Sequence, residues 1–185
     1  MKIKFVFFAV FITICLYLIP SCKKSHQDTV SGVPVGPPIS VGKSYEGGII
    51  FYVDGTGSHG LISATSDIDS LIWGDTLHTN ASGIAIGVGD TNTTTIINLF
   101  GSGNFAASAC NLIVISGFND WFLPSKVELN ILYTQKDKVG GFKEKYYWTS
   151  SEASYKYAWG QYFGNGQKDY LNKFTKCSVR PVRAF

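Results

Sequence analysis

The sequence predicts a domain of the α+β class, with helices and antiparallel strands in separate stretches, behind an N-terminal export signal. Two apolar runs around a glycine-rich turn at residues 45–64 indicate a β-hairpin. Apolar residues at helical spacing characterise the middle of the chain. Aromatic-rich runs beyond residue 146, together with an Asn-Gly turn, indicate antiparallel strands.

Residues 1–21 predict a signal peptide. Lys2 and Lys4 precede an apolar run over residues 5–19, and a small residue, Ser21, closes the segment. A membrane-spanning helix needs about 20 apolar residues, so this shorter run favours cleavage over a permanent span. The segment is expected to be absent from the mature protein.

Cys22 is the predicted lipidation site. Ile19, Pro20 and Ser21 before it resemble a lipobox, in which the cysteine is diacylated and becomes the new N-terminus. Pro20 departs from the usual pattern, and cleavage to a soluble secreted protein is the alternative. With the lipid, we expect an exported protein held in a bacterial outer membrane or at the cell surface, with the Pro/Gly/Ser-rich residues 22–40 as a spacer.

Charge and length limit what the remaining domain, residues 41–185, can do. Loss of Lys2 and Lys4 leaves 14 basic residues against 13 acidic ones, a formal charge near +1, so no nucleic-acid partner is expected. The length suits one domain with a substantial core. We expect no cofactor and no metal, because Asp54 and His59 lack a third ligand and suit a solvated turn.

Two helical segments are predicted after the hairpin. Asn92 or Thr93 is expected to cap a short helix that reaches Phe100. Residues 105–114 show a further helical spacing, which places Cys110 on a helix.

An aromatic strand over residues 120–124 is expected to lead into a third helix. Ser125 and Glu128 have the spacing of a capping box, in which each side chain accepts a hydrogen bond from the other residue's N–H. That reciprocal cap explains Glu128 without a catalytic role.

The C-terminal third is predicted to form strands over residues 146–152, 155–163 and 177–185, with a turn at 164–167. Pro181 cannot donate to a β-ladder. The last strand is therefore expected to lie at an edge or to contain a bulge.

Seven motifs occur in an order that resembles the Lcl C-terminal domain family, long catalogued as a domain of unknown function and named for the ligand-binding end of a bacterial collagen-like adhesin. They span about residues 41–185 and read YEGGIIFYVDGTGSHGLI, GDTNTT, AASAC, NDWFLPSKVELNILY, YYWTSSE, YAWGQYF and VRPVRAF. The resemblance implies a C-type-lectin-like fold, with two helices around a twisted antiparallel sheet and long loops. It also implies adhesion or carbohydrate binding, since the adhesin domain is associated with sulfated polysaccharides.

The chain departs from these relatives in two respects. It has no collagen-like repeat. The calcium motifs of true C-type lectins are missing, because Asn119, Asp120 and Trp121 have the components of Trp-Asn-Asp in another order. Calcium-dependent sugar binding is therefore not expected.

Cys110 and Cys177 are the cysteines left to the mature domain, because Cys15 leaves with the signal and Cys22 takes the lipid. Outside the cytoplasm they are predicted to form a disulfide, with two free thiols as the alternative. A bond from a helix to the last strand also resembles the long-range disulfide of the C-type lectin fold.

A sugar site needs an aromatic ring for stacking and directed hydroxyl, amide or carboxylate groups. The candidates on two neighbouring strands are Trp148, Ser150, Ser151, Glu152, Trp159 and Gln161. The competing interpretation places both tryptophans in the core, where large aromatic residues of strands usually lie.

Arg180 and Arg183 are candidates for bidentate binding of a ligand carboxylate or sulfate. Internal ion pairs with Asp120 or Glu152 are the alternative. A lysine-rich neighbourhood with interleaved acids suits either an anionic polymer or a solvated face. Its members are Lys136, Lys138, Lys143, Lys145 and Lys156.

The prediction is a non-catalytic cell-envelope lipoprotein that displays a binding or adhesion domain for carbohydrate or another envelope polymer. G-x-S-x-G, H-E-x-x-H and P-loop motifs do not occur in the sequence. One alternative is a structural or protein-binding surface lipoprotein. Another is a thiol-dependent oxidase related to formylglycine-generating enzymes, which share the broader lectin-like fold; it would use Cys110 and Cys177.

Overall fold

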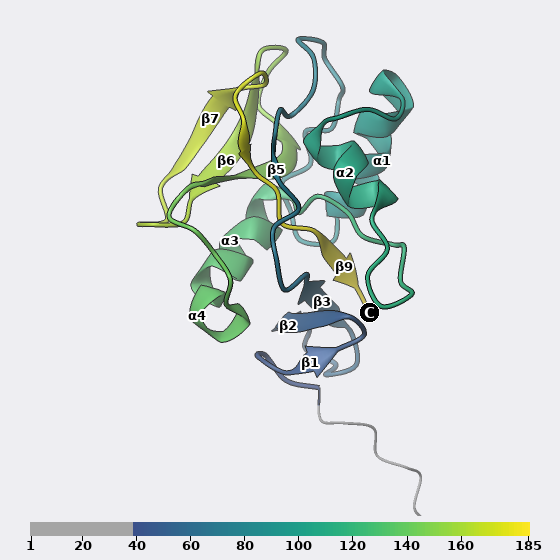
Figure 1. The fold of residues 1–185 in the computed structure, drawn as a ribbon, viewed down its shortest axis with the longest axis vertical. Helices are drawn as coiled ribbons and strands as arrows, with labels where there is room; N and C mark the ends of the chain where they lie inside the picture. Colours follow the sequence, from purple (N-terminus) through teal and green to yellow (C-terminus); the bar gives the residue numbers. More distant parts are fainter. Residues whose placement is uncertain (1–38) are drawn as a thin grey trace, which may run out of the picture. The chain divides into compact units, whose positions relative to one another are not determined.

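Four helices and two mostly antiparallel sheets make up residues 39–185 of the computed structural model, which belong to the unit Pro37–Phe185 (Figure 1). The α+β class is therefore confirmed, with four helices in this part of the chain where the family resemblance implied two. The C-type-lectin-like arrangement stays a prediction. The predicted signal peptide, Cys22 and the spacer up to residue 38 lie outside the described residues.

The first sheet contains the predicted hairpin. Its strand order is β1-β2-β3-β9, with β1 at Ser44–Tyr45, β2 at Gly48–Val53, β3 at Gly60–Ser63 and β9 at Val182–Ala184. Asp54 shapes the turn after β2, because its carboxylate accepts hydrogen bonds from the N–H groups of Thr56 and Gly57 at 3.0 and 3.1 Å. Within residues 39–185, no group of three or more His, Cys, Asp or Glu side chains is placed to hold a metal ion.

The second sheet has a central strand that is covered on both faces. The strand order is β4-β8-β5-β6-β7, with β4 at Ser70–Leu71, β8 at Cys177–Ser178, β5 at Tyr146–Glu152, β6 at Tyr157–Tyr162 and β7 at Lys168–Asn172. Tyr147 of β5 packs in one apolar cluster with Leu129. The next residue, Trp148, packs in another with Ile96 and Cys110. Successive side chains of a strand point to opposite faces, so β5 separates two cores.

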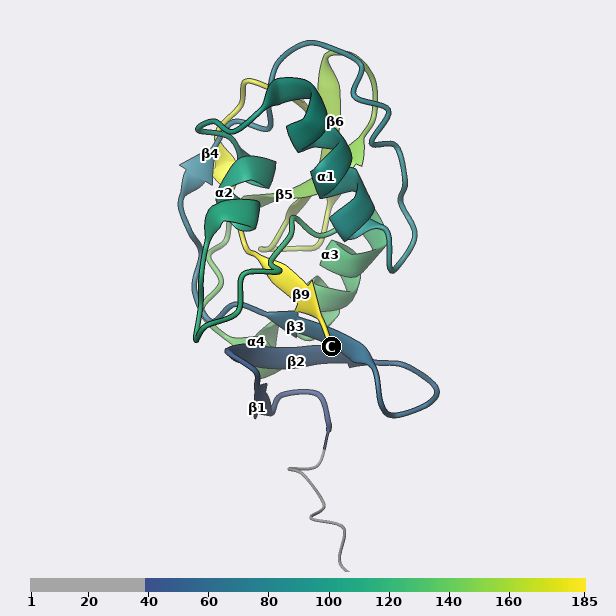
Figure 2. The ribbon, with the colours of Figure 1, turned by 90° about the vertical axis from the view of Figure 1, so that its right-hand side faces the viewer.

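The four helices divide between these two cores. α1 (Gly89–Phe100) and α2 (Ala106–Leu112) lie together on one side of β5 (Figure 2). α3 (Lys126–Thr134) contributes to the other core, and the short α4 (Lys136–Val139) follows it. Among residues 39–185, every helix is too short or too polar to cross a membrane.

The cap predicted for α1 is wrong. The helix begins at Gly89, and both Asn92 and Thr93 lie buried inside it. The Asn92 amide donates to the carbonyl of Gly83 at 2.7 Å. The Thr93 hydroxyl accepts from the N–H of Leu123 at 3.0 Å. These polar residues therefore join α1 to neighbouring loops, which local sequence does not reveal.

The capping box predicted for α3 is confirmed. Ser125 Oγ accepts from the N–H of Glu128 at 3.3 Å, and Glu128 Oε2 accepts from the N–H of Ser125 at 2.7 Å. Glu128 Oε1 also accepts from the N–H of Gly87 at 2.7 Å. Burial raises the pKa of Glu128 despite these hydrogen bonds. The residue therefore ties the start of α3 to the loop before α1.

The strand predicted over residues 120–124 is wrong. Within it, Phe122 alone forms a bridge, with Val182. The flanking donors bond elsewhere: the N–H of Leu123 reaches Thr93, and the indole N–H of Trp121 reaches the carbonyl of Phe118 at 3.1 Å. No ladder extends from this single bridge.

The last predicted strand, expected to be an edge or to contain a bulge at Pro181, is instead two short strands on either side of this residue without an N–H. β8 before the proline belongs to the second sheet, and β9 after it forms an edge of the first. Arg180, at the division, is fully buried. Its guanidinium donates to Asp67 at 2.8 Å, to the carbonyl of Ala64 at 3.0 Å and to that of Gly141 at 2.6 Å.

Cys110 lies on α2, as predicted, and Cys177 on β8. Both belong to the same apolar cluster. They are free thiols in the structure, so the predicted disulfide stays a prediction. Burial raises the pKa of both thiols, that of Cys177 to about 12. Because the thiolate is the reactive form, this environment disfavours thiol chemistry.

Replacing Arg180 with methionine is expected to lower the free energy of unfolding by about 3–5 kcal/mol, because the Asp67 carboxylate loses its buried partner. Urea unfolding followed by circular dichroism measures the loss. Lys138→Met, at an exposed position, is the control and should change stability by no more than about 0.5 kcal/mol. A loss for Arg180→Met as small as that of the control contradicts the role given to Arg180.

Protein exported to an oxidising compartment is expected to contain a disulfide between Cys110 and Cys177, since the two thiols share one cluster. Mass spectrometry after alkylation in denaturant should find no modified cysteine in the domain before reduction and both modified after it. Reduction should cost about 4 kcal/mol of stability in the chain-entropy account. Alkylation of both cysteines without reductant would show that they are free thiols and would contradict the predicted disulfide.

Candidate functional site

A groove opens between the loop at residues 82–84 and strands β6 and β7. Its volume is about 310 Å³. Eight residues line it, and they are Ser82, Ile84, Glu152, Ala153, Ser154, Tyr157, Trp159 and Tyr170. Of the residues proposed from the sequence, Glu152 and Trp159 belong to this lining.

Three aromatic side chains form one surface in the groove. Trp159 on β6 pairs with Tyr170 on β7, and Tyr157 lies two residues before Trp159, so all three rings project from the same face of the sheet. The ring of Tyr170 meets the other two edge-to-face, at 5.6 Å from Trp159 and 5.9 Å from Tyr157. Tyr157 is 39% and Tyr170 62% exposed, whereas Trp159 is partly buried. Aromatic area is therefore open to a ligand.

Helix α3 covers one end of this sheet face and places a cation at the groove. Its first residue, Lys126, holds Nζ 3.0 Å from the centre of the Trp159 ring. Partial burial and then the charge of Lys168 lower the pKa of Lys126. Within the described residues, neither lysine forms an ion pair with a carboxylate. Lys126 therefore places an ammonium group without a carboxylate partner against Trp159, and Lys168 lies near enough to Lys126 for its charge to act on it.

Trp148 and the two serine candidates lie in the interior. Trp148 is fully buried, and its indole N–H donates to the carbonyl of Leu71 at 2.9 Å. Ser151 Oγ donates to the carbonyl of Gly83 at 2.7 Å and accepts from the N–H of Lys126 at 3.0 Å. Ser150 is also fully buried. The structure corrects their proposed role as ligand contacts, because they hold neighbouring segments together.

Glu152 reaches the groove, but its carboxylate is occupied. Lys173 Nζ lies 2.5 Å from Oε1, and the N–H groups of Thr79 and Asn80 donate to the carboxylate at 3.0 and 3.1 Å. Burial opposes ionisation, but these partners outweigh it and lower the pKa of Glu152. The charge therefore belongs to an internal ion pair.

Gln161 is buried beneath α3. Its Nε2 donates to Asn130 and to the carbonyl of Gly166, both at 3.1 Å. Its Oε1 is the one buried side-chain polar atom of the described residues that lacks a partner. The amide lies outside the groove lining, so its proposed role in ligand contact is also corrected.

Both arginine candidates form internal ion pairs. Arg183 bonds Asp120 at 2.7 and 2.8 Å, the pairing given as an alternative from the sequence. The hydrogen bonds from Arg183 lower the pKa of Asp120. Arg180 instead pairs with Asp67, a partner that the sequence did not suggest. Neither guanidinium is free to bind a ligand anion.

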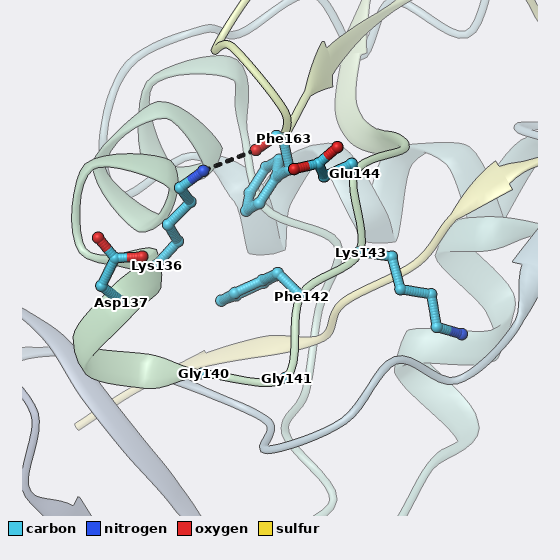
Figure 3. Close-up of a pocket in the computed structure, with 8 residues that line it drawn as sticks. All are labelled: Lys136, Asp137, Gly140, Gly141, Phe142, Lys143, Glu144 and Phe163. Carbon is cyan, nitrogen blue, oxygen red and sulfur yellow. Dashed lines mark hydrogen bonds between the residues drawn. The ribbon is translucent and has the colours of Figure 1, made fainter.

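A second hollow, of about 370 Å³, contains part of the predicted lysine-rich neighbourhood (Figure 3). Lys136 Nζ donates to the carbonyl of Phe163 at 2.8 Å, and Lys143 extends away from the ring of Phe142. Asp137 and Glu144 add opposite charges to the lining. Because its lysines are engaged or turned away, this hollow is a weaker candidate than the aromatic groove.

Sequence reasoning missed Tyr157, Tyr170, Lys126 and Lys168 as site residues. One signal was available: residues 168–172 follow an Asn-Gly turn and continue the alternation that places Tyr170 opposite Trp159. The position of Lys126 depends on the packing of α3 against β6, where Gln161 bonds Asn130, and no local pattern encodes this packing.

Residues 65–183 match the model of the family described as the Lcl C-terminal domain. The matched segment contains the whole lining of the aromatic groove together with Lys126 and Lys168. The curated proteins give no match to the chain. Because the family match spans more than half of the sequence, this protein belongs to the Lcl C-terminal domain family.

Proposed function

We propose that the domain binds carbohydrate, or a related envelope polymer, in the aromatic groove and has no catalytic role. The exposed rings of Tyr157 and Tyr170, together with the partly buried Trp159, carry this proposal. Pyranose rings present apolar C–H faces that stack on aromatic rings, while their hydroxyls need directed polar partners. Ser82 and Ser154 supply hydroxyl groups in the lining.

Lys126 and Lys168 favour an acidic saccharide over a neutral one. Their ammonium groups lack internal carboxylate partners within residues 39–185, so a ligand sulfate or carboxylate gains attraction without breaking an ion pair. The formal charge of the mature chain is small, so this attraction is local to the groove. We therefore propose a sulfated or uronate-containing polysaccharide as the preferred ligand.

We also propose display on the cell envelope through a lipid on Cys22. The signal-like N-terminus and the proline-rich residues 22–40 support it, because a spacer of this length lets a tethered domain reach a polymer. The raised thiol pKa values of Cys110 and Cys177 support a binding protein over a thiol-dependent oxidase.

A protein partner is the second candidate, favoured by apolar side chains beside the groove. Ile84 is 50% exposed, and Ile86 and Val127 are each 36% exposed. The N–H of Val127 donates to the carbonyl of Ile84 at 3.0 Å, so these two residues are neighbours. Such a surface suits a protein better than a sugar.

Tyr170→Ala is expected to weaken polysaccharide binding about tenfold, because it removes the most exposed ring of the groove. A glycan array with and without calcium, followed by calorimetry on any hit, measures the effect. Phe174→Ala is the control, since Phe174 is 54% exposed but lines a different hollow with Ile72 and Phe105. Equal losses for both variants, or uniformly null binding to the array, would falsify the groove proposal.

Lys126→Ala is expected to affect acidic and neutral polysaccharides differently. Binding of dextran sulfate should weaken and become less salt-dependent, because one partly desolvated cation is lost. Binding of neutral dextran should hold or improve, because the face of Trp159 is uncovered. Lys176→Ala, at an exposed position outside the groove, is the control. An equal loss of affinity for dextran sulfate and for neutral dextran would contradict the role of Lys126 in selecting an acidic ligand.

A further inference from the structure

The loop that forms one wall of the groove is tied to the end of β5. Ser82 belongs to this wall. The N–H of Glu152 donates to the carbonyl of Ala81 at 2.7 Å, and Ser151 Oγ donates to that of Gly83 at 2.7 Å. The position of the wall therefore depends on two consecutive residues that the sequence suggested as ligand contacts.

The side chain of Glu152 holds the preceding part of the same loop. Its Oε1 accepts from the N–H of Thr79 at 3.0 Å, and its Oε2 from that of Asn80 at 3.1 Å. Asn80 has a φ of 63°, in the left-handed region that asparagine enters more readily than most residues. The Glu152 carboxylate therefore accepts from the N–H groups of two consecutive residues of the loop.

Lys173 completes the arrangement from the other side. Its side chain is fully buried, and Nζ bonds Glu152 at 2.5 Å and the carbonyl of Leu77 at 2.7 Å. Nζ also lies 4.6 Å from the centre of the Trp73 ring. A buried ammonium is strongly destabilising once its carboxylate partner is lost. Loss of the ion pair between Glu152 and Lys173 is therefore expected to loosen the loop at residues 77–84 as well.

We infer that Glu152 is a positioning residue of the aromatic groove, whose buried ion pair with Lys173 holds residues 77–84 as the groove wall and so sets the affinity for ligand. The effect on affinity rests on the proposed function. The effect on the loop needs no ligand. Glu152 thereby acts on the ligand through the loop, while Tyr157, Trp159 and Tyr170 make the contact.

Acid is expected to release this wall. His78 faces the carboxylate from the loop, with Nδ1 3.7 Å from Oε2, and the ring of Tyr155 lies 5.9 Å from that of His78. Lys173 faces it from the opposite side. Because the pKa of Glu152 is lowered in the fold, its stabilisation is complete above the unfolded value of about 4.3 and is lost as the pH falls through the folded value. The wall is therefore held at neutral pH and loosens below about pH 4.3.

Hydrogen exchange at the amides of Thr79 and Asn80 tests the inference. In Glu152→Gln at neutral pH, both amides should exchange about tenfold faster or more than in the natural protein, because the ion pair is gone. In the natural protein, their protection should fall between about pH 6 and about pH 3 more than that of Ile62 in the first sheet. This second measurement needs no variant and remains decisive if Glu152→Gln fails to fold.

Asp120→Asn is the matched control, because it removes a carboxylate that pairs with Arg183 on the first sheet. It should leave exchange at Thr79 and Asn80 unchanged. Affinity for dextran sulfate should fall about tenfold in Glu152→Gln and hold in the control.

Protection of the two amides that responds neither to Glu152→Gln nor to acid overturns the inference. Faster exchange with unchanged affinity for dextran sulfate also overturns it, because the loop would then not set binding. Failure of the natural protein to bind dextran sulfate or any array glycan contradicts the proposed function instead. In that case the exchange data alone decide the role of Glu152 in the loop.

Discussion

The buried guanidinium of Arg180 fixes the point at which the chain leaves one sheet for the other. It bonds Asp67 and the carbonyls of Ala64, Gly140 and Gly141, which come from two distant parts of the sequence. Arginine presents five donors in a rigid plane, so its partners must hold matching positions. A buried donor or acceptor left without a partner costs more than an ordinary hydrogen bond contributes. The segments before β4 and after α4 are therefore held against the junction of β8 and β9.

The ion pair of Glu152 and Lys173 applies the same constraint near the groove. Both pairs bury a cation beside an aromatic ring and use it to bind main-chain carbonyls. Each places the charge on a C-terminal segment and the anchored loop much earlier in the chain. The domain thus holds two of its loops with buried charge, where apolar packing alone would leave their polar backbone groups unsatisfied.

The sequence predicted correctly those elements that depend on residues close together in the chain. The hairpin, the helix around Cys110 and the capping box of Ser125 and Glu128 depend on residues within a few positions of one another. The failures share a different cause. Thr93 suggested a cap, but its hydroxyl bonds Leu123 thirty residues away, and the same bond draws residues 120–124 out of a ladder. Long-range hydrogen bonds overrode local propensity in both places.

The site residues were likewise predicted only in part, because their exposure depends on long-range packing. Both tryptophans were candidates because they lie in aromatic strands, but the exposure of each ring depends on what covers it. Trp148 is buried in the core with Ile96 of α1 and Cys110 of α2, whereas Trp159 lines the groove, partly buried, with Lys126 of α3 against its ring. Ser151 and Glu152 were candidates as polar residues in an aromatic strand, and Arg180 as a guanidinium able to bind an anion through two hydrogen bonds. A buried polar group needs the same kind of hydrogen-bond partner inside the fold, and all three are buried. Polar groups that are buried in internal hydrogen bonds or ion pairs are not available to bind a ligand. The proposed binding role therefore rests on Tyr157 and Tyr170, which stay exposed, and on Lys126 and Lys168, which form no ion pair with a carboxylate among residues 39–185.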